Sequence, residues 1–218
     1  MKPVAVFCSP LPEKFGIPRQ AGVVKELKGR VVLQGEYARP QALRGLEGFD
    51  YLWLIWEFSL NGDGDGSLTV RPPRLGGNER VGVFASRSPF RPNRLGLSSV
   101  RIEKVDTESC SILVSGADLA DGTPIYDIKP YVEYTDSHPG ARSGFVDKTA
   151  WQALEIVIPE EAAAVIGPAD LQVLRSLLRE DPRPAYQEDP ERIYGLAFAG
   201  HQVHFRVSGN ILTVTGLD

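Results

Sequence analysis

The chain has 218 residues, 42% hydrophobic and 24% charged, with a formal net charge of −4. This balance is ordinary for a soluble globular protein. The longest apolar run, residues 51–56, is far shorter than the ~20 residues that span a bilayer, so no membrane segment is expected. Cys8 and Cys110 are too few for a disulfide framework, and the start lacks the apolar region of a signal peptide. We therefore expect a cytoplasmic protein.

Short strands dominate the first part of the chain, because apolar and aromatic runs there are bounded by glycine or proline. The predicted strands cover residues 4–8, 31–34, 51–58, 81–86, 98–105 and 109–115. Helical patterns are nearly absent before residue 150, although residues 40–46 could form one or two turns. Many short strands with such turns predict a barrel or a sandwich.

The character changes after a polar, turn-rich segment at residues 135–149. A helix is predicted over 168–179, because leucines recur there at helical spacing after Pro168. Residues 193–198, 203–207 and 211–214 predict a three-stranded meander. We divide the chain into a mainly β domain at 1–138, a linker at 139–150 and a small α+β domain at 151–218.

The motif-like stretches of this sequence do not support a metal site or a doubly wound nucleotide-binding fold. The stretch NGDGDGS at 61–67 resembles the opening of a calcium loop, but Pro72 stands where the bidentate Glu is needed. His201 and His204 lie three apart in a predicted strand and so face opposite sides, which disfavours zinc. There is no GxSxG elbow, no Walker loop and no GxGxxG after a strand.

Positive charge gathers at residues 71–104, where eight basic and two acidic residues give +6 in a chain of net −4. Arg87, Arg91 and Arg94 lie in a connection stiffened by two prolines. Guanidinium groups held in place suit phosphate or carboxylate, which they bind in a bidentate manner. We interpret this stretch as an anion site, and the alternative is an internal salt-bridge cluster with Glu47 or Asp50.

Two further stretches have candidate functions. Arg19 follows Pro18, which fixes the backbone and aims the charge at low entropic cost, although it could be an ordinary loop arginine. In an extended segment, Asp127, Lys129 and Tyr131 share one face, with Tyr126 and Ile128 on the other. An acid, an amine and a phenol on one face can transfer protons, although a simple Asp–Lys pair at a strand edge is the simpler reading.

The motifs GIPRQ, EGFDYLWLIWEF, TVRPPRLGGNERVGVFASRSPFRPN and DLADGTPIYDIKPYV occur in this order within residues 2–135. Together they resemble the TrmO (TsaA-like, YaeB-like) family of tRNA methyltransferases. The C-terminal segment resembles, more weakly, the smaller domain of longer bacterial members. The resemblance implies a small single-sheeted β-barrel, unlike Rossmann methyltransferases, and a homodimer. It also implies that S-adenosylmethionine methylates N6 of N6-threonylcarbamoyladenosine, beside the anticodon of threonine tRNAs.

The resemblance also implies site residues. The donor site would comprise Pro18, Arg19, Gln20, Arg87, Leu97, Asp118, Leu119, Ala120 and Asp121. Ser59 and Leu60 stand where relatives have a polar pair, and we leave both out because Leu60 is apolar. A base would be Asp127, or Tyr131 activated by Lys129. Contacts with the tRNA would come from Arg71, Arg74, Arg80, Arg91, Arg94 and Arg101, with Arg91 or Arg94 reading the threonyl carboxylate.

Two other classes of protein stay open. A non-catalytic module that binds adenosylmethionine and RNA would bind the donor without turnover. A phosphate hydrolase using the aspartate-rich turn would depend on a divalent metal, whereas methyl transfer would need none. In the methyltransferase reading, bases of the anticodon loop would stack on aromatic side chains.

Overall fold

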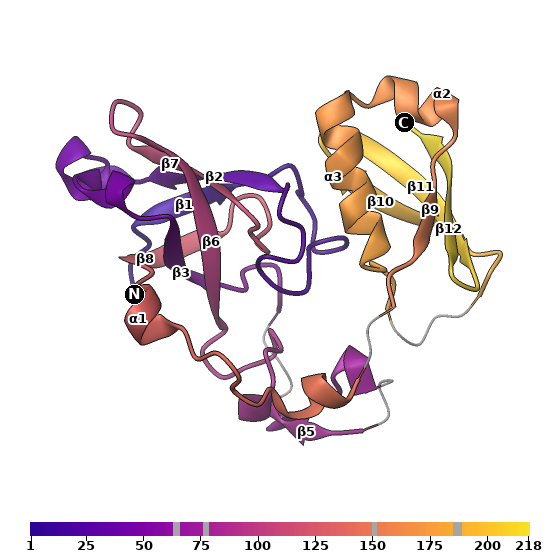
Figure 1. The fold of residues 1–218 in the computed structure, drawn as a ribbon, viewed down its shortest axis with the longest axis horizontal. Helices are drawn as coiled ribbons and strands as arrows, with labels where there is room; N and C mark the ends of the chain where they lie inside the picture. The colour runs from indigo at the N-terminus through magenta and orange to yellow at the C-terminus, as the bar shows by residue number, and fades with distance from the viewer. Residues whose placement is uncertain (63–65, 76–78, 150–151, 185–188) are drawn as a thin grey trace.

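The computed structural model describes residues 1–62, 66–75, 79–149, 152–184 and 189–218. Its N-terminal part is a closed six-stranded barrel with the neighbour order β1-β2-β7-β6-β3-β8 (Figure 1). All six pairs of neighbouring strands are antiparallel. The barrel strands are β1 (Ala5–Cys8), β2 (Lys28–Leu33), β3 (Tyr51–Glu57), β6 (Leu95–Asp106), β7 (Ser111–Ser115) and β8 (Pro124–Pro130). The predicted barrel is confirmed.

Alternation along β3 shows why this sequence closes into a barrel. Leu52, Leu54 and Trp56 are buried inside, whereas the residues between them face outward and are partly exposed. The Trp56 ring occupies space opposite Gly96 on β6, where a Cβ would overlap it. Small and large side chains therefore complement each other across the barrel, as close packing requires.

One predicted strand is mostly wrong. Within residues 81–86 only β5 (Val81–Gly82) is a strand, and it pairs with β4 (Thr69–Val70) in a ribbon outside the barrel. A 3-10 turn, η5 (Val83–Ala85), follows directly, and Ser86 Oγ donates to the Val83 carbonyl at 2.9 Å. A serine hydroxyl that hydrogen-bonds to a nearby backbone carbonyl can stabilise a turn where the apolar run alone predicts a strand.

The other short helical elements lie in connections. The turns predicted within residues 40–46 are η2 (Pro40–Leu43) and η3 (Leu46–Gly48). Further single turns are η1 (Gly35–Tyr37), η4 (Pro73–Leu75), α1 (Glu133–Asp136) and η6 (Gly144–Lys148). None of the helices in the described ranges is both long enough and apolar enough to cross a membrane.

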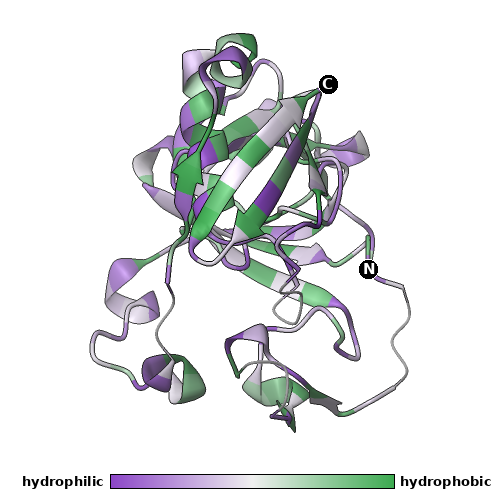
Figure 2. Cartoon of the chain, turned by 90° about the vertical axis from the view of Figure 1, so that its right-hand side faces the viewer, coloured by the Kyte–Doolittle hydropathy of each residue, from purple (hydrophilic) through white to green (hydrophobic). Residues whose placement is uncertain are grey.

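The C-terminal part is a four-stranded sheet of order β10-β11-β12-β9, packed against helix α3 (Figures 1 and 2). Helix α3 (Pro168–Arg179) has the predicted bounds. The predicted meander is confirmed as β10 (Tyr194–Phe198), β11 (His201–Ser208) and β12 (Ile211–Leu217). The prediction missed α2 (Glu160–Val165) and β9 (Glu155–Val157). Strand β9 joins the sheet by pairing in parallel with β12. A three-residue strand has too little pattern to be recognised from sequence.

The two hydrophobic cores do not follow the sequence order. One core fills the barrel. The second lies between α3 and the C-terminal sheet, and it includes Leu11, Val24 and Leu27 from the connection between β1 and β2. The Ala199 amide also donates to the Pro10 carbonyl at 2.9 Å. The β1–β2 connection is therefore built into the C-terminal core.

Candidate donor site at one end of the barrel

Three segments that lie far apart in the sequence meet at one end of the barrel. Arg87 Nη1 donates to Gln20 Oε1 at 2.6 Å. The positive charge of Arg87 also acts on the Asp118 carboxyl group. Asp118 in turn accepts a 2.5 Å hydrogen bond from Ser98 Oγ. The structure thus brings together GIPRQ, the basic stretch and the aspartate-containing turn, which the sequence presents separately.

Asp118 stands at the centre of this arrangement. Burial raises the pKa of its carboxyl group above the ordinary value, and the Ser98 hydrogen bond and the charge of Arg87 oppose that rise. Ser98 is itself positioned by Trp56, whose Nε1 donates to Ser98 Oγ at 2.9 Å. A tryptophan of the barrel interior thus orients the hydroxyl that holds the carboxylate. Sequence reasoning missed Ser98 because an isolated strand serine gives no signal.

The turn after Asp118 is closely packed. Leu119 and Ala120 are buried as whole residues, so these two predicted donor-site residues offer almost no accessible surface. The Asp121 side chain accepts from the Ser9 amide at 2.9 Å, and the Asp121 amide donates to the Leu11 carbonyl at 2.9 Å. Asp121 therefore fastens the turn to the segment that follows β1.

The other predicted donor-site residues occupy different positions. Pro18 is buried, and Arg19 Nη2 donates to the carbonyls of Asp181 and Arg183 at 3.0 and 3.1 Å, in the C-terminal part. Leu97 is 59% exposed, directly before Ser98 on β6. Because successive strand residues face opposite sides, Leu97 offers an apolar surface on the outside of the barrel.

The predicted proton-transfer residues lie on β8 and just after it. Lys129 Nζ and Asp127 Oδ2 are 3.5 Å apart, and both side chains are at least half exposed. The Tyr131 ring packs at 5.8 Å against Trp53 and at 6.1 Å, edge to face, against Tyr51. Asp127 and Lys129 therefore form the pair that the simpler interpretation predicts. The Tyr131 side chain lies on the same outer face of the barrel.

A β-bulge changes the predicted faces of β8. Ile55 pairs with Asp127, but Trp56 pairs with Ile125, so Tyr126 is an extra residue. Its hydroxyl donates to Glu57, whose side chain lies on the outer face. The prediction that Tyr126 and Asp127 face opposite sides was wrong, because alternation fails across the bulge.

Glu57 is a charged residue that the sequence reading overlooked. Arg94 Nη2 lies 3.1 Å from Glu57 Oε1, and Arg94 Nη1 donates to the Asn61 carbonyl at 3.4 Å. In the described part of the chain, the carboxylate paired with Arg94 is Glu57, instead of the suggested Glu47 or Asp50. The polar end of an otherwise apolar strand was the available signal.

The other predicted RNA-binding arginines differ in their surroundings. Arg91 bonds back to its own loop, with Nη1 at 3.0 Å from the Ser86 carbonyl. Arg80 donates to Thr69 at 2.8 Å, and Arg101 lies 3.8 Å from Glu103.

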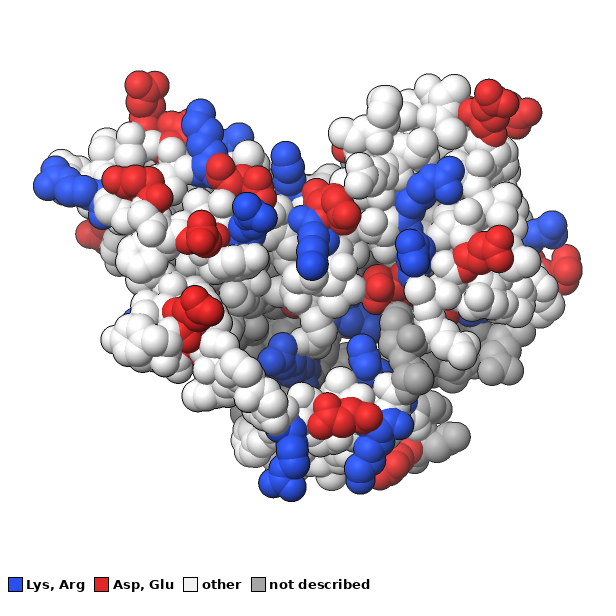
Figure 3. Space-filling model, in the orientation of Figure 1, with Lys and Arg blue, Asp and Glu red and all other residues white. Residues whose placement is uncertain are grey.

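Arg71 is exposed, and Arg74 lies close enough to Arg19 to affect it electrostatically. Figure 3 shows lysine and arginine side chains around the hollow between the barrel and the C-terminal part. The exposed Phe84, on η5, and Phe90 belong to the same basic stretch.

Among the residues that the structure describes, no three His, Cys, Asp or Glu side chains form a group that could hold a metal ion. His204 Nε2 lies 2.9 Å from a carboxylate oxygen of Asp218, which gives it an acidic partner at the end of the sheet. The calcium-like stretch at 61–67 falls partly outside the described residues.

An antiparallel barrel of this kind, with a carboxylate, an amide and a guanidinium gathered at one end, differs from the Rossmann fold. Residues 6–137 match the family model described as the tRNA-methyltransferase O N-terminal domain. Residues 152–218 match the TrmO C-terminal domain. The chain therefore belongs to the tRNA-methyltransferase O family.

Individual relatives agree with this assignment. The chain is 37% identical over 225 residues to the tRNA (adenine(37)-N6)-methyltransferase of Escherichia coli, covering 99% of this chain and 96% of that protein. A protein of the same name from Eikenella corrodens is 42% identical over 161 residues, covering 73% of this chain and 91% of its own length. The crystal structure of TrmO from Pseudomonas aeruginosa superimposes with a TM-score of 0.78 at 29% identity, covering 100% of this chain and 97% of that one.

Proposed function

We propose that this protein is an S-adenosylmethionine-dependent tRNA methyltransferase that methylates N6 of N6-threonylcarbamoyladenosine beside the anticodon of threonine tRNAs. The observation that carries the proposal is the meeting of Gln20, Arg87 and Asp118 at the end of a barrel of this family. The curated relatives from E. coli and E. corrodens, which are named for methylation of adenine 37 at N6, support it.

The residues at the barrel end fit the methyl donor chemically. S-adenosylmethionine supplies an electrophilic methyl group on a cationic sulfonium, and it also has a carboxylate and an adenosine. We assign Arg87 to an anionic group of the donor, because guanidinium binds carboxylate through charge-assisted hydrogen bonds. Asp118 provides negative charge for a cationic group, and Leu97 provides apolar surface. Orientation of this kind can supply up to ~7–11 kcal/mol of the barrier reduction.

Proton transfer is assigned to the outer face of β8. The acceptor nitrogen has a proton that must leave, and a half-exposed carboxylate such as Asp127 can accept it. Lys129 holds that carboxylate in place from 3.5 Å, and Tyr131 is braced by its aromatic neighbours. The ring contacts favour a defined position for Tyr131, and the ion pair keeps an acid and an amine adjacent on this face.

Recruitment of tRNA is assigned to the basic stretch at 71–104 and to the exposed aromatic residues in it. Its local charge of +6 attracts the RNA backbone despite the net charge of −4. We further propose a cytoplasmic homodimer, and a division into a catalytic domain at 1–138, a linker at 139–150 and a C-terminal domain at 151–218. The cores support this division except at the β1–β2 connection.

The test is incubation with methyl-labelled S-adenosylmethionine and threonine tRNA, either bearing or lacking the threonylcarbamoyl group, followed by nucleoside mass analysis. We expect one added methyl on threonylcarbamoyladenosine only, with full activity in a metal chelator. Methylation of tRNA lacking the group would contradict the proposed substrate. Donor binding without methyl transfer to either tRNA would instead indicate a non-catalytic binding module.

A further inference from the structure

We propose that the C-terminal part of this protein positions the donor-site loop at residues 16–20, and that Arg19 and Arg183 are positioning residues for donor binding. The inference rests on the proposed function, because it concerns the site assigned to S-adenosylmethionine. In this inference the C-terminal domain supports a loop that belongs to the catalytic domain. It also assigns Arg19 to the loop's support, whereas the resemblance implies contact with the donor.

The first observation is the packing of the β1–β2 connection. Leu11, Val24 and Leu27 are all buried in the core formed by α3 and the C-terminal sheet. These residues flank the loop on both sides in the sequence. The stems of the donor-site loop are therefore anchored in the C-terminal core, and only the strands beyond them belong to the barrel.

The loop itself also fits against the C-terminal sheet. Gly16 lies so close to β10 that a Cβ would overlap the side chain of Leu196. Gly16 also has a φ of +90°, a conformation that favours glycine. The neighbouring Phe15 ring stacks on Phe205 of β11, with centroids 6.3 Å apart and planes 18° apart. The sheet thus defines where the chain enters the loop.

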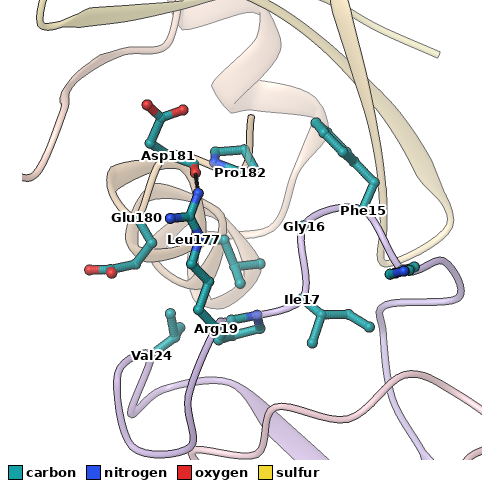
Figure 4. A pocket seen from close by; sticks show the side chains of 11 residues that line it. Phe15, Gly16, Ile17, Arg19, Val24, Leu177, Glu180, Asp181 and Pro182 are labelled. Carbon is teal, nitrogen blue, oxygen red and sulfur yellow. Dashed lines mark hydrogen bonds between the residues drawn. The ribbon is translucent and has the colours of Figure 1, made fainter. Parts of the chain in front are cut away.

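The third observation is a latch formed by Arg19. Its guanidinium group donates to the carbonyl oxygen of Asp181, just after α3 (Figure 4). It also donates to the carbonyl oxygen of Arg183. Those carbonyls are held in position because Arg183 forms two hydrogen bonds with the Asp181 carboxylate, at 2.8 and 2.9 Å. Asp181 has a φ of +48°, and its short polar side chain tolerates this turn. Arg183 therefore shapes the acceptor that Arg19 uses.

A cavity of about 330 Å³ shows that this contact is not made by close packing. It lies between the loop and the end of α3, and its lining includes Pro18, Arg19, Leu177 and Pro182 (Figure 4). Because the surfaces do not meet tightly there, the Arg19 hydrogen bonds contribute strongly to the position of the loop. The next residue is Gln20, which accepts the hydrogen bond from Arg87. A shift at Arg19 is thereby transmitted to the donor site.

The test compares Arg19→Ala, Arg183→Ala and the double variant for S-adenosylmethionine affinity by calorimetry, with melting temperature measured in parallel. We expect Arg183→Ala to weaken donor binding roughly tenfold, although Arg183 is not part of the donor site. The double variant should bind no more weakly than Arg19→Ala, because both changes release the same latch. The matched control is Arg206→Ala, an exposed arginine on β11, which should leave the affinity unchanged.

Hydrogen exchange separates this inference from the proposed function. Arg183→Ala should speed amide exchange at residues 16–22, and the Arg206 control should not. Unchanged exchange, or unchanged donor affinity in Arg183→Ala beside a loss in Arg19→Ala, would overturn the latch. If the wild-type protein fails to bind the donor, the proposed function fails, while the exchange result still tests the latch. Should Arg183→Ala not fold, Asp181→Asn breaks the same ion pair and preserves a residue that tolerates the turn.

Discussion

Arg87 donates a 2.6 Å hydrogen bond to the side-chain oxygen of Gln20, a residue 67 positions earlier in the chain. This bond joins the basic stretch to the GIPRQ loop beside Asp118. The guanidinium group remains exposed, so it has further donors for a bound anion. The pairing brings two sequence motifs together at one end of the proposed donor site.

Removing this guanidinium should weaken donor binding. We expect Arg87→Ala to raise the Kd for S-adenosylmethionine at least tenfold, because a hydrogen bond to a charged group contributes about 1.5–3 kcal/mol. Calorimetry measures the change. Arg80→Ala is the matched control, since Arg80 belongs to the same stretch but bonds to Thr69. An equal loss in both variants would assign Arg87 a general electrostatic role only.

We expect the Asp118 carboxylate to lower the stability of the folded protein and to favour donor binding. Burial raises the pKa of Asp118, so the folded state disfavours the ionised carboxylate relative to the unfolded chain. The free energy of unfolding is therefore highest at low pH and falls as pH rises through the folded pKa. Asp118→Asn should therefore raise Tm at pH 7, because a neutral amide avoids the cost of burying a charge.

The advantage of Asp118→Asn should shrink as pH falls through the raised pKa of the folded state, and it should be absent below the ordinary aspartate value of 3.8. Donor affinity should drop in the same variant, because the negative charge is lost. Thermal unfolding across pH and calorimetry at pH 7 measure the two effects. A lower Tm at neutral pH would show that the carboxylate is stabilising, contrary to the expected sign.

The phenol of Tyr131 can be tested apart from its ring. Tyr131→Phe preserves the packing against Trp53 and Tyr51 but removes the hydroxyl. If that hydroxyl takes part in proton transfer, kcat should fall by about 10²–10⁴ with donor affinity unchanged. Tyr134→Phe, at a tyrosine that is 88% exposed on α1, serves as the control. Wild-type kcat in Tyr131→Phe would confine this residue to packing.

Salt dependence should separate the basic residues into two groups. Affinity for tRNA should fall steeply with salt, and Arg71→Ala should reduce the magnitude of the log–log slope by about 1 if this exposed arginine meets a phosphate. Arg91→Ala should leave the slope nearly unchanged and lower Tm, because Arg91 bonds to its own loop. Filter binding over a salt series reports the slopes. If Arg91→Ala reduced the slope and Arg71→Ala did not, the RNA would contact the loop at Arg91 instead of at Arg71.

Local pattern determined much of the fold from sequence. The apolar and aromatic run at residues 51–58 predicted a barrel strand, and the leucine spacing after Pro168 predicted α3 with its observed bounds. The leucine period follows because burial of one helix face repeats along the chain. The family motifs likewise identified the segments that meet at the barrel end.

Only the tertiary structure decided which partners these segments have. The bulge at Tyr126, the pairing of Arg94 with Glu57 and the attachment of Arg19 to the end of α3 each join residues that are distant in sequence or break a local period. Side-chain type shows that a charge needs a partner, but chain topology selects which of many carboxylates and carbonyls is near. For that reason the sequence predicted a donor-site loop at residues 16–20, and only the structure shows that the residues flanking it pack in the C-terminal core.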